Sequence, residues 1–326
     1  MTVRILGIET SCDETAAAVV EEGVHILSNV VASQSDLHAQ YGGVFPEMAS
    51  RAHIETIHMV ISSALTQAHV SLDDLSAVAV TRGPGLAGSL LVGLNAAKGL
   101  ALARSLPLIG INHLEGHICS LQISENTHDV EFPILALIVS GGHTEMVLVE
   151  EQLQYRRLGG TLDDAAGEAF DKVAALLGLG YPGGPVIDRI ARDGNDEAIE
   201  FPIARITHND RNAKPDLSTP VGIAETRRAR RLEFSFSGLK TAVLYYLKEN
   251  GYYRSDPALP PWARPQKIPP EVIKSVAAGF QEAAVDVLVE KVDVAARLEG
   301  LGAVALSGGV ASNSLLRDRL IERAAD

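Results

Sequence analysis

The stretch FPILALIVSGGHTEMVLVE, residues 132–150, determines the fold of this chain. The run Ile134–Val139 is short and continuously apolar, which indicates a buried strand. The turn Ser140-Gly141-Gly142 follows, and Met146–Val149 resume a strand pattern. Adjacent glycines permit positive φ angles and leave backbone amides uncovered. The turn is therefore a candidate nest for a phosphate or another anion.

The N-terminus repeats this pattern. Residues 5–21, ILGIETSCDETAAAVVE, read as a strand, a polar turn and a second strand. When the two stretches are aligned, Thr15 falls over Thr144 and Glu21 falls over Glu150. Two such units, more than a hundred residues apart, indicate an internal duplication. The ordinary alternative is two unrelated hairpins.

Composition indicates a soluble globular protein. The chain has 326 residues, enough for two domains, with 46% hydrophobic and 21% charged residues. It lacks a charge-free apolar run of the roughly 18 residues that a membrane span needs, and its first residues resemble neither a signal nor a transit peptide. Two cysteines, Cys12 and Cys119, imply no disulfide framework. We therefore expect a cytoplasmic protein without a membrane partner.

The net charge of −13 argues against nucleic-acid binding by the whole surface, although a local patch stays open. Segment 205–240 is a basic island, with eight cationic residues against four acidic ones. The cations are Arg205, Arg211, Lys214, Arg227, Arg228, Arg230, Arg231 and Lys240. A tRNA contact and a solvated loop are the two interpretations of this segment.

Strands and helices alternate along the chain, which predicts an α/β architecture. We expect two halves, residues 1–128 and 129–326, with a linker at 121–131. In the first half, strands are expected at 3–20, 23–32, 77–80 and 108–111, a turn at 81–85, and helices at 54–68 and 86–103. In the second half, a hairpin is expected at 134–150 and a strand at 304–306. Helices are expected at 162–179, from 235, from 270 and at 313–323, and a turn at 181–185 is expected to end the first of them.

Several side chains are candidates for chemistry. His113 and His117 are four residues apart, so on a helix they share one face, and imidazole suits zinc or iron. Two ordinary surface histidines are the alternative, and a catalytic metal needs at least one more ligand. Glu115 between them does not match the zincin motif.

Carboxylates and glycine pairs point to a nucleotide. Four carboxylates suit acid–base work or ribose hydroxyls: Asp13, Glu14, Asp171 and Asp188. The glycine pairs 141–142, 183–184 and 308–309 follow predicted strands or precede helices, where α/β sheets bind phosphates. Together they predict a nucleotide site between the two halves. The chain has no Walker or G-x-G-x-x-G pattern.

A series of motifs extends over nearly the whole chain: GIETSCDET, YGGVFPEMASRAH, GPGLAGSLLVGL, NHLEGH, LIVSGGHTE, DDAAGEAFDK, YPGGP, FSFSGLKTA and SGGVASN. In this order they resemble the TsaD family of tRNA N6-adenosine threonylcarbamoyltransferases, formerly labelled sialoglycoproteases. The resemblance implies the duplicated actin-like ATPase fold of Hsp70 and the sugar kinases (ASKHA). Two lobes with a ligand cleft between them are then expected: residues 1–128 with the metal-binding histidines, and residues 129–326 with the phosphate loops.

The resemblance also implies an activity. The threonylcarbamoyl group of threonylcarbamoyl-AMP would pass to N6 of the tRNA adenosine just 3′ of the anticodon (position 37), in tRNAs reading ANN codons. One divalent metal ion, Fe²⁺ or Zn²⁺, would lie on His113 and His117, and ATP or ADP are alternative ligands. Substrate contacts are implied at Ile138, Val139, Ser140, Gly141, Gly142, Asp171, Gly184, Asp188 and Asn313. Partners would be an inactive TsaB-like paralogue and a TsaE-like P-loop ATPase.

Three points stay open. The family's third metal ligand is an aspartate downstream of the stretch around Asn313, which we expect beyond Asp326. Either the second lobe continues past this sequence, or the metal site here is incomplete. We hypothesise that Asp13, beside Glu14, accepts the proton of the attacking amine, although a structural role is the alternative. Other functional interpretations are a metalloprotease, an actin-like small-molecule kinase and a non-catalytic scaffold of the same complex.

Overall fold

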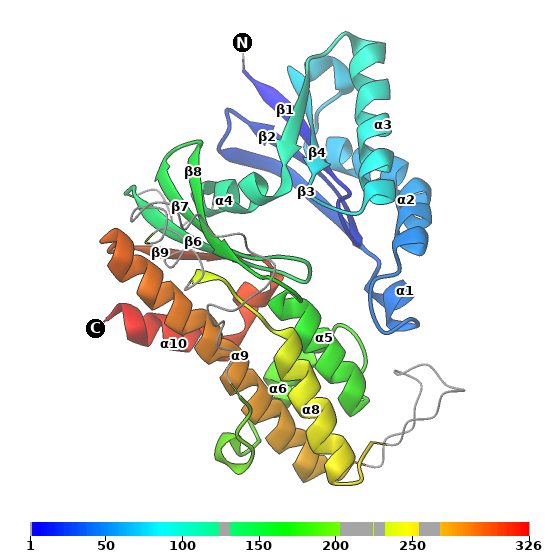
Figure 1. Cartoon of the computed structure of the whole chain (residues 1–326). Coiled ribbons are helices and arrows are strands. Elements are labelled where there is room, and N and C mark those ends of the chain that lie inside the picture. Colours follow the sequence, from blue (N-terminus) through cyan, green and yellow to red (C-terminus); the bar gives the residue numbers. More distant parts are fainter. Residues whose placement is uncertain (1, 124–130, 203–223, 225–231, 254–267, 326) are drawn as a thin grey trace. The chain divides into compact units, whose positions relative to one another are not determined.

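The computed structural model describes residues 2–123, 131–202, 224, 232–253 and 268–325 (Figure 1). It divides into two compact units, Met1–Val130 and Glu131–Asp326. The predicted boundary at residue 128 lies two residues before this division. Among the described residues, no helix has both the length and the apolar character needed to cross a bilayer.

Unit 1 contains one five-stranded sheet in the order β3-β2-β1-β4-β5. Its strands are β1 Arg4–Glu9, β2 Glu14–Glu21, β3 His25–Ser33, β4 Ala77–Gly83 and β5 Leu108–Asn112. The first three strands are antiparallel because short turns join them, whereas β4 and β5 run parallel to β1 after helical crossovers. The carboxyl ends of β1, β4 and β5 therefore meet at one edge of the sheet.

The helices described in unit 1 are α1 Ser35–Ala39, α2 Pro46–Gln67, the 3₁₀ turn η1 Leu72–Asp74, α3 Ala87–Arg104 and α4 His113–Ile123. The two long helices α2 and α3 lie against the sheet (Figure 1). Helix α2 packs on β2 and β3, and α3 packs on β4. The core between them contains Leu6, Val19 and Val78 from the strands with Ile57 and Ile61 from α2.

Unit 2 contains a four-stranded sheet in the order β8-β7-β6-β9. Its strands are β6 Ile134–Val139, β7 Thr144–Glu151, β8 Gln154–Gly160 and β9 Val304–Ser307. Every residue of β6 is buried, which explains its continuous apolar run: both faces of the strand are covered. Strand β9 pairs with β6 in parallel, while β6, β7 and β8 form an antiparallel meander.

The helices of unit 2 pack around α9, whose long apolar face is buried along most of its length. They are α5 Ala166–Leu177, α6 Gly183–Ala191, η2 Asp196–Ala198, α8 Ser237–Glu249, α9 Pro270–Glu299, η4 Gly309–Ser312 and α10 Ser314–Ala324. Phe170 of α5 meets Phe280 of α9 edge to face, with 5.0 Å between ring centroids. This aromatic pair lies in the largest core of the chain's described residues.

The predicted duplication is confirmed. Each unit has a strand-turn-strand pair, a third antiparallel strand and a further strand parallel to the first. The aligned threonines lie at equivalent places, Thr15 near the start of β2 and Thr144 at the start of β7, and both are fully buried.

One strand was missed and several predicted boundaries were wrong; the helix expected from residue 54, for example, begins at Pro46. Strand β8 was missed because its sequence, QYRRLGG, has charged and glycine residues in place of an apolar run, and half of it is exposed. The segment 181–185 was predicted to end the preceding helix, but α5 already ends at Leu177, with Gly178 as its C-cap, and α6 begins at Gly183. The first-half turn at 81–85 was placed too early because β4 continues to Gly83, and α4 continues to Ile123, inside the predicted linker.

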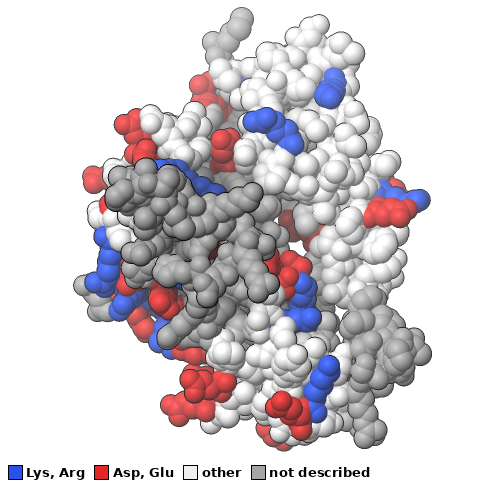
Figure 2. Space-filling model, viewed as in Figure 1, with Lys and Arg blue, Asp and Glu red and all other residues white. Residues whose placement is uncertain are grey.

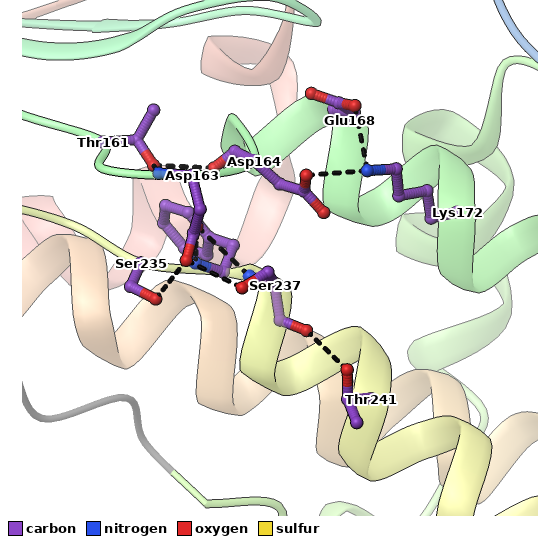
Figure 3. Close-up of polar contacts among 9 residues, drawn as sticks. Thr161, Asp163, Asp164, Glu168, Lys172, Ser235, Ser237 and Thr241 are labelled. Atoms are coloured by element: carbon purple, nitrogen blue, oxygen red, sulfur yellow. Dashed lines mark hydrogen bonds and ion pairs between the residues drawn. The ribbon is translucent and has the colours of Figure 1, made fainter.

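Asp163 and Asp164 were predicted in the first turn of a helix, but they precede α5, which begins at Ala166. Asp163 instead accepts hydrogen bonds from the hydroxyl groups of Ser235 and Ser237, at 2.5 and 2.7 Å, and from backbone amides at the start of α8 (Figure 3). These contacts lower the pKa of Asp163, although its partial burial acts in the opposite direction. Asp163 therefore fixes the start of α8 from another segment of the chain.

Candidate functional site

The two candidate metal ligands lie on α4, directly after β5. His113 is the first residue of α4, and His117 follows one turn later. Their rings are half-buried and nearly perpendicular, with 4.8 Å between centroids and an angle of 81°. The prediction that both rings share one helix face is therefore confirmed.

Glu9 contacts His113 and was not predicted as a site residue. It ends β1, and its Oε2 lies 3.1 Å from Nδ1 of His113. Oε2 also accepts a hydrogen bond of 2.6 Å from the hydroxyl of Thr81, while the backbone amide of Ser11 donates to Oε1. Burial raises the pKa of Glu9, but the hydrogen bonds from His113, Thr81 and Ser11 outweigh burial and hold this pKa at about 2. Glu9 is therefore a carboxylate over the whole working range of pH.

Asp13 and Glu14 lie next to this pair, in the turn between β1 and β2 and at the start of β2. Asp13 is half-buried, and its carbonyl oxygen accepts a hydrogen bond of 3.0 Å from the amide of Gln34. Glu14 is exposed to solvent. Partial burial raises the pKa of Glu14, and the charges of Asp13 and Glu9 raise it further. Three carboxylates thus lie within six residues of the chain, and their environments differ.

A buried relay of hydrogen bonds fixes the turn that carries Asp13. The amide of Phe45 lies 3.3 Å from Nδ1 of His38, so this nitrogen accepts. Nε2 of His38 then donates to Oε1 of Gln34 at 3.1 Å, and Nε2 of Gln34 donates to Nδ1 of His53 at 3.2 Å. Nε2 of His53 finally donates to the carbonyl oxygen of Cys12 at 3.0 Å.

This relay requires both histidines to be neutral, because each accepts at Nδ1. Both side chains are fully buried, and burial lowers the pKa of His38 and of His53. Thr15 Oγ1 lies 2.7 Å from Nδ1 of His53, so the aligned threonine also belongs to this network. The turn of unit 1 is therefore held by side chains from α2 and from the segment before α1.

The donor set at α4 fits a metal only in part. Across the residues that the structure describes, no group of three or more His, Cys, Asp or Glu side chains could together hold a metal ion. His113 and His117 offer two imidazoles, and the carboxylate of Glu9 supports the first of them. Imidazole nitrogens backed by a carboxylate are a common arrangement around zinc and iron. A complete site needs further ligands in addition to this pair.

The glycine turn in unit 2 follows β6 as predicted. The amide of Ser140 donates to the carbonyl oxygen of His143 at 2.8 Å, and the amide of His143 lies 3.1 Å from Oγ of Ser140. Gly141 and Gly142 are exposed. Ile138 and Val139 are completely buried, so a substrate would meet their backbone and not their side chains.

The N-terminus of α5 packs directly on this turn. The amide of Gly167 donates to the carbonyl oxygen of Ser140 at 3.3 Å, and a Cβ on Gly167 would lie 2.6 Å from the same oxygen. One turn further along α5, Asp171 accepts a hydrogen bond of 2.7 Å from the amide of Gly183. This contact fixes the start of α6 and places Gly184 in its first turn.

The remaining candidates, Asp188 and Asn313, both bond to the start of α10. Oδ1 of Asp188 accepts from the hydroxyl of Ser314 at 2.7 Å and from its amide at 3.2 Å, while Oδ2 pairs with Arg192 at 3.0 Å. Asn313 caps α10 by accepting from the amide of Leu316 at 3.0 Å. The side-chain groups of both residues thus have partners within the protein.

The predicted residues of unit 2 therefore form one connected series: the turn 140–142, then α5, α6 and the start of α10. In unit 1, the predicted residues lie in the turn with Asp13 and at the start of α4, where His113 contacts the unpredicted Glu9. Sequence reasoning missed Glu9 and Thr81. The signal was present, because both lie at the carboxyl ends of predicted parallel strands.

The basic island lies outside the described residues, except for Lys240 on α8. On the face drawn in Figure 2, most of the described Lys and Arg side chains have Asp or Glu side chains nearby. Ion pairs such as Arg51–Glu47 and Arg157–Glu145 account for several of the described cations.

Solved structures establish the class of fold. Component A of the (R)-2-hydroxyglutaryl-CoA dehydratase of Acidaminococcus fermentans aligns with a TM-score of 0.52 at 14% identity, over 99% of this chain and 88% of that chain. Full-length HypF aligns with a TM-score of 0.54 at 15% identity, over 99% of this chain and 51% of that chain. At such identities the likeness concerns the fold alone. The two lobes thus have the duplicated actin-like ATPase (ASKHA) fold.

Sequence comparison identifies the family within this class. A family model described as TsaD, tRNA N6-adenosine threonylcarbamoyltransferase, matches residues 25–326. The tRNA N6-adenosine threonylcarbamoyltransferase of Syntrophotalea carbinolica is 49% identical over 98% of this chain and 83% of that protein. The enzyme of the same name from Syntrophus aciditrophicus is 50% identical over the same shares. The chain belongs to the TsaD family, whose members are acyltransferases that modify tRNA.

Proposed function

We propose that this chain transfers the threonylcarbamoyl group of threonylcarbamoyl-AMP to N6 of the tRNA adenosine just 3′ of the anticodon, with release of AMP. Family membership is the observation that carries this proposal: about half of the residues are identical to named transferases over nearly the whole chain. The metalloprotease interpretation has no comparable support, because Glu115 does not stand in a zincin motif.

The donor defines what the protein must do. Threonylcarbamoyl-AMP is a mixed anhydride of a carbamate and a phosphate, so AMP is already a good leaving group. The amine of adenosine is a weak nucleophile, and holding it beside the donor carbonyl supplies a large part of the rate enhancement. We propose that the amides of the turn Ser140-Gly141-Gly142 bind the phosphate, as exposed amides of a tight turn do.

In unit 2, we propose that the ribose and phosphate also meet the series formed by Asp171, Gly184, Asp188 and Asn313. The contacts of Asp171 with Gly183 and of Asp188 with Ser314 fix the backbone around these residues. Because Asp188 and Asn313 are already bonded within the protein, their contribution would be made by remaining acceptor capacity and by neighbouring backbone amides.

In unit 1, we propose that His113 and His117 hold one divalent metal ion together with a ligand outside the described residues. When bound, such an ion supplies a Lewis acid for the donor. Asp13 is the proposed acceptor of the amine proton, and Glu14 beside it is the second candidate for this role. The buried relay from His38 to Cys12 supports the assignment to Asp13, because it holds the turn in one conformation.

We further propose that the enzyme works in the cytoplasm on tRNA, with a TsaB-like paralogue and a TsaE-like P-loop ATPase as partners. The basic island at residues 205–231 is the proposed tRNA contact. Charge reversal of Arg227, Arg228, Arg230 and Arg231 should weaken tRNA binding and flatten its salt dependence.

The test is transfer in a single turnover, with tRNA, synthetic threonylcarbamoyl-AMP, a divalent metal and the partner proteins supplied. We expect modified adenosine and AMP in equal amounts. His113→Ala should lower bound metal and transfer together, while the exposed His25→Ala should leave both unchanged. Asp13→Asn should slow transfer while leaving bound metal unchanged. Metal binding without transfer by the native chain would favour the scaffold interpretation instead.

A further inference from the structure

We infer that Glu9 is a positioning residue for His113: its carboxylate fixes the tautomer of the imidazole, so that Nε2 is the nitrogen presented to a divalent cation. The inference deepens the proposed function and rests on its assignment of His113 as a metal ligand. Glu9 itself would touch neither the metal nor the substrate. Glu9 stands in the stretch GIETSCDET, and its contact with His113 depends on the tertiary structure.

The geometry around Glu9 is that of a carboxylate held from several sides. Its Oε2 lies 3.1 Å from Nδ1 of His113 and 2.6 Å from the hydroxyl of Thr81, and the amide of Ser11 donates to its Oε1. These contacts come from the ends of β1 and β4 and from the start of α4. The carboxylate therefore cannot turn away from His113 without losing two other hydrogen bonds.

The topology of unit 1 produces this meeting. Strands β1, β4 and β5 are parallel neighbours, so their carboxyl ends lie at one edge of the sheet. Glu9 ends β1, Thr81 lies near the end of β4, and β5 leads directly into His113. Three segments that are far apart in sequence thus supply an acceptor, an orienting donor and an imidazole at one place.

The protonation states follow from donor and acceptor rules. An ionised carboxylate can only accept hydrogen bonds, so Nδ1 of His113 must carry the proton. Both oxygens of Glu9 accept hydrogen bonds, Oε1 from the amide of Ser11 and Oε2 from the hydroxyl of Thr81, as those of an ionised carboxylate do. The hydroxyl of Ser11, 3.1 Å from the same nitrogen, can accept from the same N–H group. A neutral imidazole protonated at Nδ1 has its lone pair at Nε2, the atom that would bind a metal.

A carboxylate in this position also increases the electron density of the imidazole. Metal-bound histidines commonly donate their second nitrogen to a carboxylate, and loss of that partner lowers metal affinity about 10–100-fold. The competing explanation is that the Glu9–His113 pair only attaches α4 to the sheet. The two explanations differ in the tautomer that they predict for His113 when Glu9 is changed.

The experiment has two readouts on the full chain. The first is the tautomer of His113 in the metal-free protein, from long-range ¹H–¹⁵N correlations with His113→Ala for assignment. We expect the Nδ1-protonated form in the native protein and a mixture of tautomers in Glu9→Gln, since an amide can accept or donate. The second is Zn²⁺ affinity from chelator competition, which we expect to fall about 10–100-fold in Glu9→Gln.

Controls separate this inference from the proposed function. Glu115→Gln removes the same charge from α4 and should change neither readout. Thr81→Val removes the donor that orients the carboxylate, so it should lower Zn²⁺ affinity less than Glu9→Gln does; it also serves as the second variant if Glu9→Gln fails to fold. Unchanged Zn²⁺ affinity in His113→Ala would overturn the proposed ligand. Loss of affinity in His113→Ala but not in Glu9→Gln, or an unchanged tautomer in Glu9→Gln, would overturn the role of Glu9 alone.

Discussion

The turns after β1 and after β6 occupy equivalent places in the two units, yet they are held in different ways. In unit 1, Thr15 contacts His53 on the following helix α2, and His53 donates onward to the carbonyl oxygen of Cys12 in the turn. In unit 2, Thr144 accepts directly from the amide of Ala166, at the first residue of α5, with 2.9 Å between the atoms. The same threonine thus has a side-chain partner in one unit and a backbone partner in the other.

This difference corresponds to what each turn can offer a substrate. In unit 1 the turn is rich in carboxylates, and its carbonyl oxygens accept from the side chain of His53 on α2 and from the backbone amides of Gln34 and Leu86. In unit 2, glycines let the start of α5 contact the turn backbone directly: the amide of Gly167 bonds to the carbonyl oxygen of Ser140. The two units share one strand-turn-strand arrangement. The turn of unit 1 carries acidic side chains, whereas the turn of unit 2 has exposed backbone amides.

The largest effect is expected in unit 2 where close backbone packing coincides with a positive φ angle. Gly308 has a φ of +95°, and a Cβ there would overlap the carbonyl oxygen of Val139. Gly308→Ala therefore combines an unfavourable backbone conformation with overpacking, and we expect a loss of about 2–4 kcal/mol in the free energy of unfolding. Denaturant titration would measure it.

The neighbouring Gly309→Ala is the matched control, because a Cβ at Gly309 meets nothing within 4 Å. We expect it to cost less than about 1 kcal/mol. Equal losses of stability in both variants would show that the contact with Val139 at the end of β6 does not set the cost at Gly308.

The two aligned threonines provide the most direct comparison. Thr144→Val leaves the buried amide of Ala166 without its acceptor, and an unsatisfied buried donor costs about 1–3 kcal/mol. Thr15→Val leaves no buried donor without an acceptor, because Nδ1 of His53 still accepts from Gln34. We therefore expect a loss below about 1 kcal/mol for Thr15→Val.

Unfolding free energies of the two valine variants would test this order, and hydrogen exchange at the amide of Ala166 would localise the effect in Thr144→Val. A larger loss in Thr15→Val than in Thr144→Val would show that the first turn depends on its threonine more than the relay suggests.

The smallest effect is a dependence on pH that we expect in unit 1. Burial lowers the pKa of His38 and His53 in the folded protein, whereas in the unfolded chain their pKa is near 6.5. Below that pH the unfolded chain binds more protons than the folded one, so stability should fall as pH decreases from about 6.5 towards the folded-state values.

His53→Gln should flatten this profile, because glutamine can accept and donate without titrating. Unfolding of native and variant protein between pH of about 7.5 and 5.5 would measure the difference. Equal slopes in the two proteins would assign the dependence to other groups.

The sequence by itself determined the repeated strand-turn-strand units, the glycine turn and the shared face of His113 and His117. These features depend on local chemistry: a continuous apolar run, two adjacent glycines, and a four-residue spacing on a helix. The family could also be read from motifs distributed over the whole chain. The same local reasoning missed β8, whose sequence has too few alternating apolar residues. It also missed α6, which begins inside the glycine- and proline-rich segment 181–185 that predicts a turn.

Only the tertiary structure decided which polar groups meet. Glu9, Thr81 and His113 lie at the ends of three different segments, and the register of parallel strands brings them together. Asp188 and Asn313 likewise looked free to bind a substrate in the sequence, but their positions beside Ser314 and Leu316 give them partners within the protein. Hydrogen bonds between distant segments depend on strand order and helix packing, and neither of these is encoded in the local pattern of residues.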